Sequence, residues 1–170
     1  MTTSRREMLG ALAVTTAALA PQTVAATGRD LDLAALKKDT DVACLYHCDF
    51  GDPQRFSQML QNMLNHYSVY DHDGMRLKLV VVAHGQGLKF FLRDLTGTPW
   101  ERDPIDPDLF KRFEGLAKYG AEAYLCRITF KRLNIDPAKA REGSSFSFVP
   151  SGVATVAELQ GKGFAYLKTG

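Results

Sequence analysis

The sequence predicts an α/β fold, a three-layer α/β/α sandwich built around a mostly parallel five-stranded sheet. Short apolar runs that suit buried strands alternate five times along the chain with segments that suit helices, as in parallel sheets covered on both faces. The run at 77–83 is β-branched and nearly unbroken, as expected of a central strand. Between Phe56 and Tyr67, apolar residues recur at helical spacing and form one stripe. We therefore expect a single α/β domain at residues 27–170.

The other elements are placed by apolar runs and by turn residues. A strand at 42–48 precedes the striped helix, which Asp52 caps and Pro53 begins. The further strands are expected at 121–126, 146–149 and 164–168. The further helices are expected at 31–38, 88–95, 108–118, 127–133 and 153–160. The proline-marked loop at 96–107 carries Trp100, and we expect a flap over the site or a contact between subunits there.

The N-terminus has the composition of an export signal. Arg5 and Arg6 precede a mildly apolar run at 8–20, and the small residues at 24–26 suit a signal peptidase. The arginine pair resembles the twin-arginine signal, and the apolar run is shorter than the about 20 residues that span a bilayer. We expect residues 1–26 to be a cleaved signal peptide and the mature protein to act in the periplasm, outside the membrane.

Composition and motifs exclude several functions. The chain of 170 residues has a formal net charge of +2 and no concentrated basic face, which argues against a nucleic-acid partner. The sequence lacks the dinucleotide fingerprint, the P-loop pattern and close-spaced metal ligands such as C-x-x-C. We therefore expect no cofactor.

Cys126 is the candidate nucleophile, because it stands where a strand is followed by a helix. Backbone N–H groups at a helix N-terminus favour a thiolate, and Arg127 adds a full positive charge beside it. Thr129 could donate a hydrogen bond within the same helical turn. The alternative is a structural role, since free cysteine is often a small apolar core residue.

Further reactive groups follow the first two predicted strands. His47 and Cys48 end the first strand, and the sequence His84-Gly85-Gln86-Gly87 follows the second. Because the carboxyl ends of parallel strands share one edge, we expect these groups to lie on one rim with the candidate nucleophile. Gly85 and Gly87 would let the chain turn tightly or let a ligand approach. His84 could instead simply bond a neighbouring backbone carbonyl.

The three cysteines of the mature chain leave at least one thiol unpaired within the molecule. Cys44 and Cys48 are four strand residues apart, about 13 Å, which is too far for a disulfide. A bond between Cys48 and Cys126 remains open, because both lie at strand ends.

Four stretches resemble the DsrE/DsrF-like family of sulfur-relay proteins, in its small single-domain branch. They are GDPQRF with LQNMLNHY, VVVAHGQGLKFF, YLCRITFKRLNI, and VPSGVATVAELQGKGFAYLK. The resemblance implies a homo-oligomer, often a trimer or a hexamer. It also implies that Cys126 carries sulfane sulfur as a persulfide, received from or passed to a donor or acceptor protein or a small sulfur compound.

Three functions are compatible with these residues. The first is an exported sulfur carrier on Cys126, possessing a sulfurtransferase-like activity or acting only as a carrier. The second is a metal-binding module that uses His47, Cys48, His84 and Cys126. The third is a periplasmic oligomer that holds a small anion without turnover.

Overall fold

A parallel sheet forms the middle layer of the computed structural model, which describes residues 28–170. Within these residues the sheet has six strands in the order β1-β5-β4-β3-β2-β6, and every neighbouring pair is parallel. The strands are β1 (Arg29–Asp30), β2 (Val42–Cys48), β3 (Leu77–Ala83), β4 (Glu122–Cys126), β5 (Phe146–Val149) and β6 (Ala165–Leu167). The predicted α/β class with a parallel sheet is confirmed, and the two-residue β1 is the strand that was not predicted.

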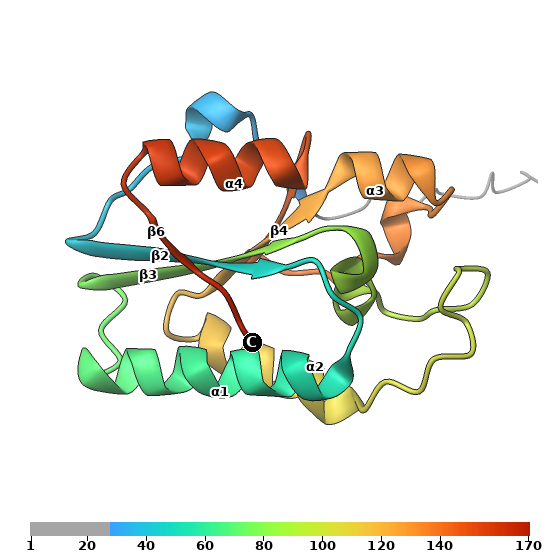
Figure 1. Cartoon of the computed structure of the whole chain (residues 1–170), viewed down its shortest axis with the longest axis horizontal. Helices are drawn as coiled ribbons and strands as arrows, with labels where there is room; N and C mark the ends of the chain where they lie inside the picture. Colours follow the sequence, from blue (N-terminus) through green and yellow to red (C-terminus); the bar gives the residue numbers. More distant parts are fainter. Residues whose placement is uncertain (1–27) are drawn as a thin grey trace, which may run out of the picture.

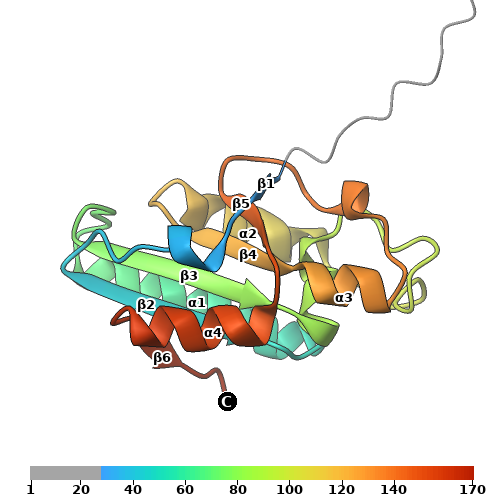
Figure 2. The same cartoon turned by 90° about the horizontal axis from the view of Figure 1, so that it is seen from above.

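Helices cover both faces of this sheet. The α-helices are α1 (Pro53–Val69), α2 (Pro107–Ala117), α3 (Arg127–Arg132) and α4 (Gly152–Gly161), and the 3-10 helices are η1 (Leu33–Ala35), η2 (Gly85–Phe91) and η3 (Pro137–Lys139). Figure 1 shows α1 and α2 below the sheet and α4 above it, with α3 beyond the end of β4 on the same side as α4. The view from above in Figure 2 shows α4 over β2, and α4 contacts β2, β3 and β4. No helix in the described range is long and apolar enough to cross a membrane.

Side-chain caps fix where the long helices begin. Asp52 accepts hydrogen bonds from the backbone N–H groups of Gln54 and Arg55, and Pro53 occupies the first turn, as predicted. Asp106 caps α2 and Ser151 caps α4 in the same way. Such caps satisfy backbone donors that have no partner inside the helix, and so they set its start.

Two hydrophobic layers result from the alternation of side chains along the strands. In β3, Leu79 and Val81 point into the layer between the sheet and helices α1 and α2. Val80 and Val82 point into the layer between the sheet and α4. Because both faces are covered, a strand with apolar residues at every position is favoured here. The predicted stripe of α1 is buried in the first layer apart from Leu64, which is 40% exposed.

The register of the strands brings their carboxyl ends to one edge. Cys48 of β2 pairs with Ala83 of β3, and Ala83 pairs in turn with Leu125 of β4. The residues that follow these positions, His84 and Cys126 among them, therefore emerge at the same level. The predicted signal peptide at 1–26 lies outside the described residues.

Candidate functional site

A pocket of about 420 Å³ opens at the carboxyl edge of the sheet. Four residues singled out from the sequence line it, namely His84, Gly85, Cys126 and Thr129. The remaining lining residues are Ile128 and Arg132 of α3, Leu133 directly after it, and Ser151 and Val153 at the start of α4. The volume falls within the range of about 300–1,000 Å³ that small-molecule sites occupy.

Cys126 is both largely buried and part of the pocket wall. It is the N-cap residue of α3, its side chain makes no capping hydrogen bond, and 4% of the residue is exposed. Little of this residue is therefore accessible, and the pocket that it lines offers a route to the thiol. Because α3 has only six residues, the helix supplies a modest positive field at this sulfur.

Two arginines of α3 differ in where they point. The Arg127 guanidinium donates to both carboxylate oxygens of Asp30, at 2.8 Å each, and lies 3.6 Å above the centre of the Phe148 ring. It therefore contacts β1 and β5 and does not line the pocket. Arg132 does line the pocket, is exposed, and forms no ion pair with a carboxylate of the described range.

Arg132 was not predicted as a site residue from the sequence, although helical geometry could have identified it. Five residues along a helix correspond to a rotation of about 140°, so Arg127 and Arg132 must point to different sides. Gly152 at the start of α4 was also missed. A Cβ atom at Gly152 would lie 2.7 Å from the Cβ of His84, so this glycine lets α4 pack directly on the histidine.

His84 belongs to a short hydrogen-bonded chain. Its Nε2 lies 2.6 Å from Nε2 of His47, and Nδ1 of His47 lies 2.9 Å from the hydroxyl of Tyr166 in β6. Only one proton can lie between the two Nε2 atoms, so one of these nitrogens must be an acceptor. The chain thus connects the pocket to the edge strand β6.

The burial of both imidazoles favours their neutral forms. Burial lowers the pKa of His84 below its ordinary value, and the nearby carboxylate of Asp49 partly opposes this shift. Burial also lowers the pKa of His47, with Asp49 acting in the opposite direction and the charge of His84 adding to the shift. A neutral imidazole can accept a proton, which a general base must do.

The two glycines of the turn after β3 have different roles. Gly85 adopts a positive φ of 53°, and its N–H donates to the hydroxyl oxygen of Thr129 at 3.0 Å. Thr129 therefore ties the turn to α3, and its hydroxyl proton stays available to a ligand. A Cβ atom at Gly87 would lie 2.1 Å from the carbonyl oxygen of Cys48. Gly87 therefore allows the backbone of this turn to pass close to the backbone at the end of β2.

The other two cysteines are core residues. Burial raises the pKa values of both Cys44 and Cys48, and Cys48 has no exposed surface. The structure contains all three cysteines as free thiols, so Cys48 is not bonded to Cys126. Among residues 28–170, no group of three or more His, Cys, Asp or Glu side chains is arranged to hold a metal ion.

Comparisons with known proteins agree with the fold. A solved structure of a protein of unknown function from Methanobacterium thermoautotrophicum superposes with a TM-score of 0.59 at 20% identity, covering 75% of this chain and 99% of that one. It shows the same fold and carries no functional information. No curated protein matches the chain. The model of the DsrE/DsrF-like family matches residues 11–169, a range that begins within the predicted signal peptide. The chain therefore belongs to the DsrE/DsrF-like family.

Proposed function

We propose that this protein accepts sulfane sulfur as a persulfide on Cys126 and passes it on. One observation carries the proposal: among the three thiols, Cys126 is the one that lines a described pocket, and it shares that pocket with the imidazole of His84 and the guanidinium of Arg132, which forms no ion pair within residues 28–170. Membership of a family often linked to sulfur relay supports the same reading.

The proposed step is a displacement at sulfur. The Cys126 thiolate attacks the outer sulfur of a donor persulfide, R–S–SH. A bond forms between Sγ and that sulfur, the S–S bond of the donor breaks, and R–S⁻ leaves with the bonding electrons. The acceptor reaction is the same exchange in reverse, with a new thiolate attacking the outer sulfur on Cys126. Neither exchange requires an external oxidant or reductant.

His84 is the base that this step requires. When its Nε2–H donates to His47, and Nδ1–H of His47 donates to Tyr166, the Nδ1 atom of His84 is left with a free lone pair. That nitrogen can take the proton from the thiol, and the lowered pKa keeps it unprotonated near pH 7. His47 and Tyr166 act as positioning residues that hold the required tautomer.

Arg132 is the anion-binding group of the proposed site, with Thr129 as a second donor. The leaving thiolate R–S⁻ is anionic, as is a donor whose R group carries a negative charge, so an unpaired guanidinium at the pocket stabilises them. The ion pair of Arg127 with Asp30 instead joins α3 to β1. We therefore assign the charge role expected of Arg127 to Arg132, and to Arg127 the positioning of the helix that begins after Cys126.

The proposal is tested by loading the protein with a persulfide donor, removing the excess and releasing bound sulfur with cyanide. We expect wild type and Cys44→Ala to release similar amounts of thiocyanate and Cys126→Ser to release almost none. Because Cys44 lines no described pocket, Cys44→Ala controls for the loss of a buried thiol. A Cys126→Ser protein that carries the wild-type load would refute the proposal.

Assembly and export are further parts of the proposal. Ile128 and Val153 are 47% and 67% exposed and flank the pocket, which supports contact with another chain, either a second copy in a trimer or hexamer or a sulfur-relay partner. Light scattering that gave a monomer at all concentrations would contradict the oligomer.

The arginine pair supports twin-arginine export, and an Arg5→Lys, Arg6→Lys chain that still reached the periplasm would contradict it.

A further inference from the structure

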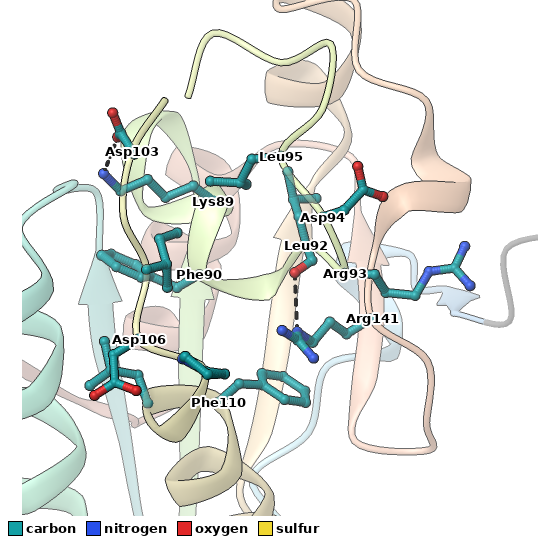
Figure 3. A pocket seen from close by; sticks show the side chains of 13 residues that line it. Lys89, Phe90, Leu92, Arg93, Asp94, Leu95, Asp103, Asp106, Phe110 and Arg141 are labelled. Atoms are coloured by element: carbon teal, nitrogen blue, oxygen red, sulfur yellow. Dashed lines mark hydrogen bonds and ion pairs between the residues drawn. The ribbon is translucent and has the colours of Figure 1, made fainter. Parts of the chain in front are cut away.

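We propose that a second pocket binds a small organic carboxylate that has an apolar body, with the carboxylate on Arg141. This pocket has a volume of about 330 Å³ and shares no lining residue with the Cys126 pocket. It lies between η2, the loop that follows η2, and the start of α2 (Figure 3). The inference is independent of the sulfur chemistry proposed above.

Apolar side chains form most of the wall. They come from η2, from the following loop and from α2, namely Phe90, Leu92, Leu95, Ile105, Leu109 and Phe110. Burying an apolar ligand against such a surface contributes roughly 25 cal/mol per Å² of apolar area. The wall therefore favours an aromatic or aliphatic body over a small hydrated ion such as phosphate.

Arg141 supplies the positive charge inside this pocket. Its Nε donates to the carbonyl oxygen of Leu92 at 3.1 Å, and its guanidinium carbon lies 3.7 Å from the centre of the Phe110 ring. Figure 3 shows the guanidinium reaching over Phe110 with its terminal nitrogens toward the interior. Within residues 28–170 it forms no ion pair with a carboxylate.

The other two cations of the wall already have partners. Nζ of Lys89 lies 2.6 Å from a carboxylate oxygen of Asp103, and Arg93 lies 3.0 Å from Glu142. In Figure 3, the Arg93 side chain points away from the pocket. Arg141 is therefore the wall cation whose charge a ligand would balance.

The carboxylates of the wall are also occupied. Asp103 pairs with Lys89, Asp94 lies 2.7 Å from Nζ of Lys139, and Asp106 accepts from the N–H of Asp108 as the cap of α2. A cationic ligand would have to compete with these partners. An anion, in contrast, would meet the guanidinium of Arg141, whose charge has lost part of its hydration. Burial lowers the pKa of Arg141, and the negative charge of Glu114 only partly opposes this shift.

The backbone holds Arg141 in place before any ligand arrives. Leu92 and Ala140 form an antiparallel bridge, the N–H of Arg93 donates to Lys139 at 2.8 Å, and the N–H of Arg141 donates to Phe91 at 2.9 Å. The loop at 96–107, expected to cover the reactive site or to contact a subunit, does not line the Cys126 pocket but forms a wall of this second pocket, and its Trp100 is buried in the core. A preformed site loses little free energy in ordering its side chains on binding.

The test compares a carboxylate with its neutral counterpart on the full chain. Calorimetric titration with 3-phenylpropionate and with 3-phenylpropan-1-ol should show the carboxylate binding about tenfold more tightly or better, the factor expected for one charge-assisted contact. Arg141→Gln should remove that difference, whereas Arg141→Lys should keep part of it. Arg93→Gln removes a guanidinium that pairs with Glu142 and points away from the pocket, so this variant should bind as wild type does.

Three results would overturn the inference. They are equal affinity for the acid and the alcohol, no saturation with the acid by about 10 mM, and equal weakening in Arg93→Gln and Arg141→Gln. Thermal unfolding of each variant identifies misfolded protein. If Arg141→Gln is misfolded, Arg141→Lys, which keeps the positive charge, tests whether binding of the acid requires that charge. Cys126→Ser should bind 3-phenylpropionate as wild type does, which separates this inference from the sulfur-carrier proposal.

Discussion

The Nε2 atoms of His47 and His84 lie 2.6 Å apart, so the histidine after β3 and the histidine near the end of β2 must share one proton between them. His84 also lines the Cys126 pocket, and His47 is bonded on its other side to Tyr166. These three residues, in β2, directly after β3 and in β6, link the proton positions of the two imidazoles, and when Nε2–H of His84 donates to His47 the Nδ1 atom of His84 is left as an acceptor.

Replacing this base should slow sulfur transfer. We expect His84→Gln to lower the rate of persulfide formation on Cys126 by about 10²-fold to 10⁴-fold, the usual contribution of a positioned general base. The loss should shrink as the pH rises and the thiolate forms without help. His66→Gln is the matched control, because His66 is a half-buried histidine of α1 that does not line the pocket. Equal rates in the two variants by stopped-flow measurement would remove His84 from the mechanism.

The histidine pair should also make stability depend on pH. Both pKa values are lowered in the folded protein, whereas an unfolded histidine titrates near about 6.5. Between the folded and unfolded pKa values the unfolded chain binds more protons, so the free energy of unfolding falls as the pH drops below about 6.5 and is unaffected above it.

Urea unfolding at several pH values measures this effect. The His47→Gln, His84→Gln double variant should lose less stability on acidification than wild type does. His66, whose pKa is also lowered by burial, remains in both proteins and contributes equally. Parallel pH curves for the two proteins would contradict the assignment.

Variants of the two arginines of α3 should separate the binding of an anionic donor from the stability of the fold. Arg132→Gln is expected to weaken binding of an anionic persulfide donor by about tenfold, seen as a higher KM with near-normal stability. Arg127→Gln should leave the KM unchanged and lower the free energy of unfolding by about 0–1 kcal/mol, because its pair with Asp30 is partly exposed. The reverse pattern would return the charge role to Arg127.

Gly87 should tolerate no side chain. A Cβ atom there would meet the backbone carbonyl of Cys48 at 2.1 Å, and backbone cannot rotate away, so Gly87→Ala should cost about 1–3 kcal/mol or more. Gly115 lies in α2 with no atom near its added Cβ, so Gly115→Ala should instead stabilise by about 0.4–1 kcal/mol. Chemical denaturation of both variants decides whether the turn after β3 is as tight as described.

Most of the fold was predictable because it rests on apolar periodicity. The runs that became β2 and β3 and the stripe that became α1 are long and strongly patterned, and their positions agree with the structure. Strand β1 was not predictable, because its two exposed residues carry no pattern and pair only with β5. The expected helix at 88–95 starts earlier and is the 3-10 helix η2, since the turn at Gly85 leads directly into it.

The site was predictable only in part. The rule that parallel strands end at one edge places His84 and Cys126 on one rim, and both line the same pocket. Sequence position could not show that Arg127 faces Asp30, because that carboxylate is distant in the chain and belongs to an unpredicted strand. Tyr166 lies far from His47 in sequence, so their hydrogen bond becomes visible only once β6 is placed beside β2.

The most direct test is the mass of the intact protein under non-reducing conditions after incubation with a persulfide donor. We expect the wild-type protein to be heavier by the mass of one sulfur atom, with the added sulfur located on the peptide that contains Cys126 and lost after cyanide treatment. A wild-type protein of unchanged mass, or one whose added sulfur maps to Cys44 or Cys48, would contradict it.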